Sequence, residues 1–263
     1  MNWRLLLLPF SWLFGTVTFL RRWLYEKGVL SSEKSSVATI CVGNLKVGGT
    51  GKTPHIEYLI RLLRKDFSVA VLSRGYGRES KGYLLVNDLP DNQLNALQIG
   101  DEPMQLFQKF PDVKIALSEK RALGVRSLRK QFPDLDVILL DDGFQHLSFS
   151  PSLKMILTEF ADPYFKDYPL PAGNLREFPF ASKSADAVIV TKCPTSIDEN
   201  DREHYKRKLK ITPKQHAFFS SIIYKYSIED KLRGNIMNLD QDTSVFLLTG
   251  IANPKPLLRE VAK

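Results

Sequence analysis

The sequence has little cysteine and no long uninterrupted apolar run. Only two cysteines occur in 263 residues, and Cys41 and Cys193 each lie in an apolar stretch rather than beside other metal-ligand side chains. This pattern argues against a disulfide framework or a cysteine metal cluster and is typical of reduced core thiols in a cytosolic protein. Internal repeats and low-complexity tracts are also absent.

The N-terminus, residues 1–30, is unusually apolar. Leu5–Leu20 is interrupted by Pro9 and Gly15 and is shorter than the ~20 apolar residues of a membrane-spanning helix. No small-residue cleavage motif follows it, which argues against a removed signal peptide. Aromatic and basic residues accompany the run, namely Trp3, Arg4, Trp12, Arg21, Arg22 and Trp23. We expect a helix lying in a membrane interface; a helix docked on the core and a true span remain alternatives.

The composition indicates a packed protein. Apolar residues make up 43% and charged residues 25% of the chain, which argues against global disorder. Lysine and arginine number 37 against 29 acidic residues. This excess suits nucleic acid, anionic lipid or polyphosphate, and also a mildly basic soluble protein with no such ligand. The length predicts one large α/β domain and part of a second.

From residue 37 onward, short apolar runs alternate with helical segments. Helices are expected from near Thr53, over Glu119–Phe132, and over the charged Ile197–Lys214. The predicted strands are Val37–Val42, Ser68–Ser73, Lys114–Leu117, Asp136–Leu140, Met155–Leu157, Ala187–Thr191 and Ser244–Thr249. The alternation predicts a parallel sheet with helices on both faces, in which ligands bind beyond the carboxyl ends of the strands.

A glycine-rich segment, Gly43–Pro54, follows the first predicted strand and opens a helix. This is the context of a Walker A phosphate loop, in which glycines let successive backbone N–H groups face a polyphosphate. Lys52 is expected to reach the β and γ phosphates and Thr53 to join a Mg²⁺ shell. The Walker A pattern has glycine at the position of Lys46, and Gly48 and Gly49 are expected to supply the backbone flexibility instead. The predicted ATP-binding residues are Lys46, Val47, Gly48, Gly49, Thr50, Gly51, Lys52 and Thr53.

The domain prediction follows from this loop. Residues 31–220 are expected to form an α/β core resembling P-loop NTPases, and residues 221–263 a connector and the incomplete start of a smaller second α/β domain.

Acidic residues follow later elements. Asp141 and Asp142 come directly after a buried strand, where paired carboxylates suit Mg²⁺. Asp101 and Glu102 stand at a probable helix start before Pro103. Asp101 is predicted to accept a proton from a substrate hydroxyl and Glu102 to lie near the metal, while an N-cap role for Asp101 is the alternative.

Four further residues are candidates for substrate binding. Arg74 and Arg121 follow strands and suit phosphate groups, although either can be a solvated surface residue. His146 either orients a phosphate or closes its loop. Arg176 lies in the turn-rich Leu170–Glu177, which is expected to line a substrate groove.

The nucleotide is predicted to be ATP. Thr191-Lys192-Cys193-Pro194 falls where guanine-specific P-loop proteins carry Asn-Lys-x-Asp, and proline replaces the base-reading acid.

Taken together, the motifs resemble the tetraacyldisaccharide 4'-kinase (lipid A 4'-kinase) family over essentially the whole chain. The matching segments are the apolar N-terminus, Gly43–Pro54, Ser73–Gly77, Gly100–Pro103, Asp141–His146, Leu170–Glu177 and Thr249–Pro254. The resemblance implies transfer of the ATP γ-phosphate to the 4'-hydroxyl of a tetraacylated glucosamine disaccharide 1-phosphate in lipid A biosynthesis. By position, Asp101 matches the family's proposed base, Lys52 and Thr53 fall in its phosphate loop, and Asp141 and Asp142 match its metal-side acids. The expected catalytic residues are therefore Asp101 and Lys52.

The resemblance further implies a setting for the protein. The expected location is the cytoplasmic face of the bacterial inner membrane, with peripheral or interfacial attachment. The expected partners are the lipid A precursor and the membrane surface, without nucleic acid or an obligate protein partner.

Two points stay open at this level. The family carries an Asp-His-His segment in a C-terminal lobe, and this sequence contains none, so a C-terminally truncated chain is expected. The rival functions are a P-loop nucleotide-hydrolysing switch or metallochaperone with a protein partner, and a non-catalytic membrane-surface binding module.

Overall fold

The structure is a computed structural model that describes residues 3–224, 227–229, 236–238, 246–247, 249 and 254–261. The chain divides into two compact units, Met1–Ser220 and Ser221–Lys263, and each is treated by itself.

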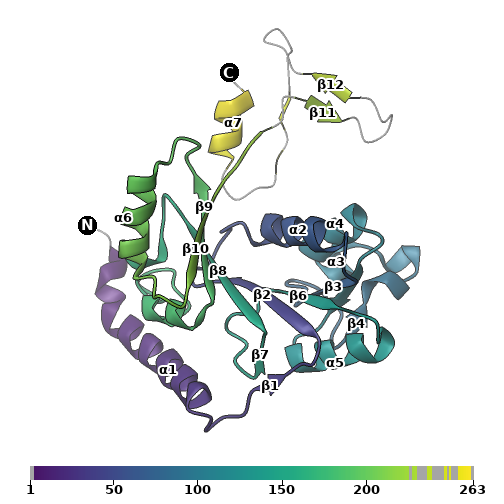
Figure 1. The fold of residues 1–263 in the computed structure, drawn as a ribbon, viewed down its shortest axis with the longest axis horizontal. Helices are drawn as coiled ribbons and strands as arrows, with labels where there is room; N and C mark the ends of the chain where they lie inside the picture. The colour runs from purple at the N-terminus through teal and green to yellow at the C-terminus, as the bar shows by residue number, and fades with distance from the viewer. Residues whose placement is uncertain are drawn as a thin grey trace. The chain divides into compact units, whose positions relative to one another are not determined.

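The larger unit is built on an eight-stranded sheet with the order β10-β9-β8-β2-β6-β3-β5-β4 (Figure 1). Neighbouring pairs from β9 to β5 are parallel, and β4 is antiparallel to β5. The strands are β2 (Ala38–Asn44), β3 (Val69–Ser73), β4 (Leu84–Leu85), β5 (Lys114–Leu117), β6 (Val137–Asp141), β8 (Leu153–Glu159), β9 (Ala187–Cys193) and β10 (His216–Ser221). A separate parallel pair joins β1 (Glu33–Lys34) to β7 (Phe149–Ser150).

Helices cover both faces of this sheet, because successive side chains of each buried strand point to opposite sides. Val71 and Leu139 pack with α2 and α4, whereas Leu72 and Leu140 pack on the side of α5. Figure 1 shows α2 and α4 on one face and α5 on the other. The helices are α2 (Lys52–Leu63), α3 (Ala96–Ile99), α4 (Asp101–Lys109), α5 (Arg121–Gln131) and α6 (Glu199–Leu209), with 3-10 turns at Val86–Asp88, Asp91–Gln93, Tyr164–Lys166 and Pro179–Ser184. The predicted α/β class is confirmed.

Two predicted helices are shorter than expected. The helix predicted from Glu119 begins at Arg121, and the one predicted over Ile197–Lys214 spans only α6. Asp198 is the N-cap of α6, because its side chain accepts a hydrogen bond from the Asp201 amide, and the helix therefore begins at Glu199. Lys210 adopts a left-handed conformation at its C-terminus.

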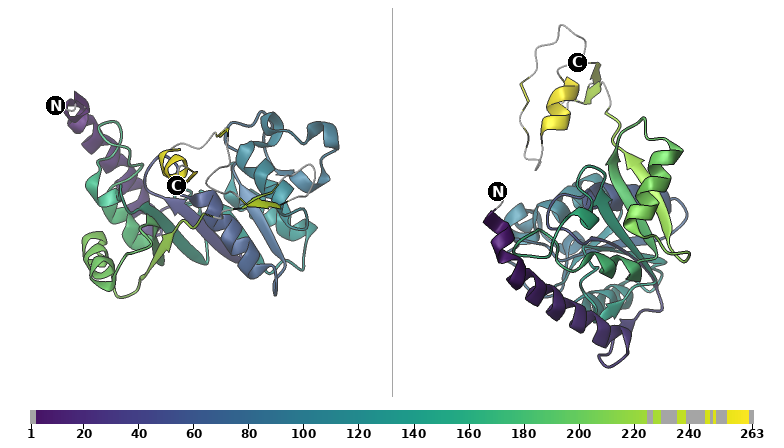
Figure 2. Two further views of the ribbon diagram at one scale, coloured as in Figure 1. Left: turned by 90° about the horizontal axis from the view of Figure 1, so that it is seen from above. Right: turned by 90° about the vertical axis from the view of Figure 1, so that its left-hand side faces the viewer.

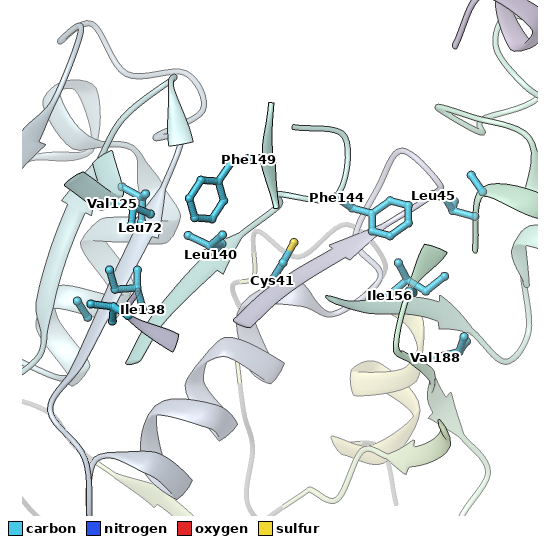
Figure 3. Close-up of a cluster of buried hydrophobic side chains, with 14 of the residues drawn as sticks. Cys41, Leu45, Leu72, Val125, Ile138, Leu140, Phe144, Phe149, Ile156 and Val188 are labelled. Carbon is cyan, nitrogen blue, oxygen red and sulfur yellow. The ribbon is translucent and has the colours of Figure 1, made fainter. Parts of the chain in front are cut away.

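A core cluster extends from the sheet to the loop that follows β6 (Figure 3). Phe144 of that loop is buried and lies near Leu45 and Ile156, with Cys41 between this group and Leu140. Cys41 and Cys193 are both free and buried, as predicted. Burial raises the pKa of Cys41 to about 12, so its thiol stays protonated and unreactive.

The N-terminus forms a 3-10 turn, Trp3–Leu7, that continues into α1 (Leu8–Glu26). By length and composition alone Trp3–Glu26 suits a membrane span, and only 11% of its apolar window is buried. The helix runs along one side of the larger unit (Figure 2) and packs on aromatic residues near Pro179–Ser184. A Cβ on Gly15 would lie 2.4 Å from the Phe178 ring, and Phe19 meets Phe180 at 5.3 Å between ring centroids.

The smaller unit contains the antiparallel pair β11 (Ser227–Glu229) and β12 (Ile236–Asn238), and the helix α7 (Lys255–Val261). The strand predicted over Ser244–Thr249 falls largely outside the described residues; Phe246, Leu247 and Thr249 are described and are not in a strand.

Candidate active site

The glycine-rich loop connects the end of β2 at Asn44 to the start of α2 at Lys52. Gly48 and Gly51 have φ angles of 123° and 91°, which residues with a Cβ rarely adopt. The buried Asn44 side chain donates to the Thr50 hydroxyl over 2.9 Å, and Val47 N donates to Asn174 O over 2.8 Å. The loop is therefore held in shape from inside and from a neighbouring segment.

Strand β9 supplies a third support for this loop. The Lys192 ammonium donates to Gly49 O over 2.8 Å and to Glu159 over 2.7 Å. The Thr191 hydroxyl donates to Thr50 O over 3.0 Å. The sequence had marked Thr191-Lys192 only as a position for a base reader, and this supporting role was missed.

Lys46, where the motif has glycine, directs its ammonium toward two acids. It pairs with Asp162 and, over 2.9 Å, with Asp167. Burial acts to lower the pKa of Lys46, but the hydrogen bonds to Asp162 and Asp167 outweigh it and raise the pKa. Lys46 does not line the cleft beside the phosphate loop. Phosphate binding by Lys46 remains a prediction, and with the side chain engaged by two acids it would involve the backbone N–H.

A cleft of about 640 Å³ lies at the carboxyl ends of β3 and β6, beside the phosphate loop. The structure brings most predicted site residues to it. Its lining residues are Val47, Lys52, Ser73, Arg74, Tyr76, Asp101, Glu102, Pro103, Asp141, Asp142, Gln145, His146 and Arg176. Ser73, Tyr76 and Gln145 were not predicted, although Ser73 and Tyr76 belong to a strand end that the sequence had placed on the ligand side.

Asp141, the last residue of β6, is 3% exposed and lacks a full set of partners. Its Oδ2 accepts from the Ser73 hydroxyl over 3.1 Å, whereas Oδ1 has no hydrogen-bond partner. Burial, and then the nearby Glu102 carboxylate, raise the pKa of Asp141 to about 6. A buried carboxylate oxygen without a donor is a poor structural element and a suitable ligand for a cation.

Other oxygens near Asp141 fit a Mg²⁺ ion. The Thr53 hydroxyl donates to Glu102 Oε1 over 3.2 Å, and Glu102 lines the cleft with Asp141. No group of three or more His, Cys, Asp or Glu suited to a metal occurs among the described residues. Carboxylate and hydroxyl oxygens are the kinds of ligand that Mg²⁺ takes, together with water and phosphate oxygens.

Asp142 has a different environment from its neighbour. Both of its carboxylate oxygens accept from Arg176 Nη1 at 2.9 Å, and Lys52 Nζ lies 3.8 Å from Oδ2. Its φ of 50° is left-handed, an uncommon conformation for a non-glycine residue that often occurs at functional sites. Asp142 thus holds two cations of the cleft together.

Asp101 is the first residue of α4 and is exposed on the cleft wall. The N-cap position is occupied by Gly100 and there is no side-chain cap hydrogen bond, so the alternative N-cap role for Asp101 is not observed. Within the described part of the chain, its carboxylate makes no hydrogen bond or ion pair. It is available to a ligand.

Arg121 does not line the cleft. It is 2% exposed and donates to the carbonyl oxygens of Asp141 and Ser118, behind the end of β6. Direct substrate binding by Arg121, as predicted, stays a prediction; the contacts describe a residue that supports the backbone of Asp141. The sequence alone does not show whether an arginine that follows a strand is buried in the protein or faces the cleft.

His146 lines the cleft and also a cavity of about 180 Å³ on the side of α1. Burial and then the cations Arg121 and Arg74 lower the pKa of His146 to about 4. The ring is therefore neutral at physiological pH and can accept a hydrogen bond through one nitrogen.

Comparisons with known proteins agree on one family. A family model described as Tetraacyldisaccharide-1-P 4'-kinase matches residues 3–263. A curated Tetraacyldisaccharide 4'-kinase from Flavobacterium johnsoniae is 44% identical over 253 residues, which are 96% of this chain and 73% of the relative. Another, from Bacteroides thetaiotaomicron, is 42% identical over 266 residues, 97% of this chain and 69% of the relative.

One similar solved structure is that of LpxK from Aquifex aeolicus in complex with ATP. It is 41% identical with a TM-score of 0.65, and the match covers 71% of this chain and 58% of that chain. The matched part of the present chain therefore spans less than two thirds of the solved protein.

Proposed function

The chain belongs to the tetraacyldisaccharide-1-P 4'-kinase family, and from this membership we propose that its cleft transfers the γ-phosphate of ATP to the 4'-hydroxyl of a tetraacylated glucosamine disaccharide 1-phosphate. The family match and the curated names support an ATP-dependent lipid A 4'-kinase and do not favour the nucleotide switch or metallochaperone. The observation that carries the proposal for this chain is the cleft itself. It holds Lys52, the partly unpartnered Asp141 and the free Asp101 together.

ATP is the proposed phosphate donor. The Aquifex aeolicus relative was solved with ATP, and the glycine loop presents its backbone at the N-terminus of α2, a favourable position for phosphates. Asp141, Thr53 and Glu102 would hold Mg²⁺, which would neutralise charge between the β and γ phosphates. Lys52, whose ammonium lies 3.8 Å from Asp142 Oδ2, is proposed to neutralise the transferring phosphoryl group.

Asp101 is the proposed proton acceptor. Its carboxylate is exposed to the cleft and has no competing partner among the described residues, which suits a group that must accept a hydroxyl proton. Arg74, His146 and Arg176 also line the cleft and are proposed to contact the sugar or its phosphate. Arg121 is proposed to assist from behind by holding the Asp141 carbonyl.

The proposed location is the cytoplasmic face of the bacterial inner membrane. The acceptor is a lipid, and α1 carries exposed apolar side chains beside the larger unit. Peripheral attachment through α1 would bring the cleft to a substrate that stays in the bilayer.

The decisive experiment incubates the chain with γ-labelled ATP and Mg²⁺, with and without the tetraacylated disaccharide 1-phosphate in detergent micelles. The proposal expects label on the lipid at the 4' position, and little hydrolysis when the lipid is omitted. Label released only as inorganic phosphate, at the same rate with or without lipid, would contradict the kinase and favour a hydrolytic switch.

A further inference from the structure

One arginine of the apolar N-terminal helix is turned into the protein. Arg22 is 5% exposed, although its neighbours Arg21 and Trp23 are both exposed. Its Nε donates to Glu177 Oε2 over 2.6 Å and its Nη2 to Glu177 Oε1 over 2.8 Å. A buried charge is retained only where a partner compensates its desolvation, and this bidentate pair supplies that partner.

The same guanidinium also contacts the loop after β6, residues 142–147, which we call the acid loop. Nη2 lies 3.4 Å from Phe144 O, and the guanidinium carbon lies 4.7 Å from the centre of the Phe144 ring. A third nitrogen, Nη1, donates to the Ser184 hydroxyl over 2.8 Å. Phe144 itself is buried (Figure 3) and lies so close to Gly43 that a Cβ there would be 2.6 Å from Phe144 Cβ. Phe144 is therefore packed between Arg22 on one side and Gly43 of β2, the strand that leads into the phosphate loop, on the other.

Glu177, the partner of Arg22, is connected to Asp142 through the residue that precedes it in the chain. The residue before it, Arg176, donates to both oxygens of Asp142 at 2.9 Å and to Gln145 Oε1 at 3.2 Å. Arg176 N donates to Leu45 O over 2.7 Å. Adjacent side chains thus reach in opposite directions, one to α1 and one to the acid loop, from a backbone that is tied to the base of the phosphate loop.

We propose that Arg22 is a positioning residue for phosphoryl transfer. It holds Asp142–His146 in place directly through Phe144 and indirectly through Glu177 and Arg176. Because Asp142 accepts from Arg176 and lies 3.8 Å from Lys52, a shift of this loop would displace two cations of the proposed phosphate-transfer site. Displacements of about 1 Å at such a site cost on the order of 10²-fold in rate.

The inference assigns α1 a role beyond contact with lipid. An arginine that only anchored the helix would affect α1 and its aromatic contacts with Phe178 and Phe180, and would leave the acid loop unchanged. The proposal instead expects the loop and the helix to respond together. The activity part of this inference rests on the proposed kinase function, whereas the structural part does not.

The test compares the whole 263-residue chain with Arg22→Gln, Arg22→Lys and the double variant Arg22→Gln with Glu177→Gln. Arg126→Gln is the matched control, because Arg126 pairs with Glu33 at 2.7 Å in an exposed ion pair away from the cleft. Amide hydrogen exchange is followed by mass spectrometry in three segments, 3–26, 142–147 and 174–178. In parallel, kcat and KM for ATP are measured with the lipid acceptor.

We expect Arg22→Gln to speed exchange in 142–147 and 174–178 by at least tenfold, and to lower kcat at least tenfold with KM for ATP within twofold of the original. Arg22→Lys keeps the charge but loses the bidentate geometry, so intermediate values are expected, and this variant decides the question if the glutamine variant does not fold. The double variant also removes the Glu177 carboxylate, which Arg22→Gln leaves buried without a cation, and should therefore be better protected from exchange than Arg22→Gln alone. Arg126→Gln should change neither readout.

Faster exchange confined to residues 3–26, with 142–147 as protected as before, would overturn the proposal. An equal loss of kcat and ATP affinity, with a general loss of protection, would also overturn it, because that pattern is global destabilisation. If the unmodified chain transfers no phosphate to lipid, the proposed function fails, and the exchange comparison still decides the role of Arg22.

Discussion

At the scale of single residues, two adjacent carboxylates have opposite surroundings. Asp141 is buried, has an oxygen without a partner, and has its pKa raised to about 6. Asp142 is half-buried and accepts from Arg176 Nη1 through both carboxylate oxygens, with Lys52 nearby. Different environments can give two carboxylates different roles. Asp141 is suited to bind a cation from solution, whereas Asp142 is already paired with the side chains of Arg176 and Lys52.

His146 gives a prediction about acid stability. Burial lowers its pKa in the folded chain to about 4, from the ordinary histidine value of 6.5. At pH 7 this ring is neutral in the folded chain and mostly neutral in the unfolded chain. As the pH falls from 7 to 5, only the unfolded chain gains the proton, so the free energy of unfolding decreases. After allowance for solvent screening, the loss at this residue is about 1–2 kcal/mol.

The measurement is chemical denaturation of the original chain and of His146→Gln at pH 7 and pH 5. The original chain should lose about 1–2 kcal/mol more than the variant over this interval. His204→Gln, at an exposed position of α6, is the control and should follow the original chain. Equal acid sensitivity of the original chain and His146→Gln would show that the ring is not held neutral.

Asp101 gives a prediction that separates proton transfer from nucleotide binding. Asp101→Asn keeps the side-chain shape but removes the proton acceptor, so phosphate transfer to lipid should fall by about 10²–10⁴-fold. The dissociation constant for ATP with Mg²⁺ should stay within threefold, because the described structure gives Asp101 no contact with the phosphate loop. Calorimetric titration with ATP and the labelled-lipid assay measure the two effects.

Lys52→Met is the contrasting variant for the same pair of assays. Loss of its ammonium from the helix N-terminus should weaken ATP binding at least tenfold, about 1.4 kcal/mol. Normal transfer by Asp101→Asn would remove Asp101 from the mechanism while leaving the phosphate-loop assignment intact.

At the scale of elements, the phosphate loop is supported mainly by segments distant in sequence. Lys192 of β9 holds the Gly49 carbonyl, Asn174 accepts from Val47, and Lys46 pairs with Asp162 and Asp167. The Lys46 ion pairs join the loop to the turn around Tyr164–Lys166, so the residue that departs from the glycine pattern has a structural function here.

A substitution that restores the pattern should therefore be harmful. Lys46→Gly removes the ammonium from Asp167, a half-buried acid, and should lower the free energy of unfolding by about 1–3 kcal/mol. It should not tighten ATP binding. Lys46→Ala separates the ion pair from the added backbone freedom of glycine, which is worth about 0.5–1 kcal/mol.

Denaturant unfolding and ATP titration check this prediction. Lys206→Ala is the control, since it breaks an exposed pair with Glu203 on α6 and should change the free energy of unfolding much less than Lys46→Gly does. A Lys46→Gly chain as stable as the original, or one that binds ATP more tightly, would show that the ion pairs with Asp162 and Asp167 contribute nothing.

The buried elements could be predicted because their signals are local. The five-residue strands β3 and β6 are buried at every position and read as continuous apolar runs, and the glycine loop and the acid pair follow strand ends. The family and the kinase class were also predicted from these motifs and are confirmed.

The long-range contacts could not be predicted in this way. Arg22 reads as one of several basic residues flanking an apolar run, and nothing local indicates that it meets Glu177, 155 positions later. Arg121 follows a strand like Arg74, yet one is buried and the other lines the cleft. Which side of a helix or loop faces inward depends on packing that the local pattern does not encode.

At the scale of the whole molecule, exposed apolar side chains gather on one helix of the larger unit. Trp3–Glu26 presents Trp3, Leu6, Phe10, Trp12, Leu13, Val17 and Leu20 to solvent. Its other side is occupied by Arg22, Gly15 and the aromatic contacts with Phe178 and Phe180. An exposed patch of this kind marks an interaction surface, and its arginines and tryptophans suit anionic lipid at the membrane interface.

The last prediction removes this patch without disturbing the contacts beneath it. Leu6, Phe10 and Leu13 are 77%, 63% and 65% exposed and lie on one side of the helix at spacings of four and three residues. Replacing all three with serine should lower partitioning onto vesicles of phosphatidylethanolamine and phosphatidylglycerol at least tenfold, because each buried apolar side chain contributes on the order of 1–2 kcal/mol. The midpoint of thermal unfolding should stay within about 2 °C, since these side chains are already in water. Tyr58→Ser with Leu62→Ser, a matched exposed pair on α2, should leave vesicle binding unchanged. Equal losses from both sets of substitutions would mean that the chain adheres to lipid through apolar surface in general, and α1 would then have no special part in bringing the cleft to its acceptor.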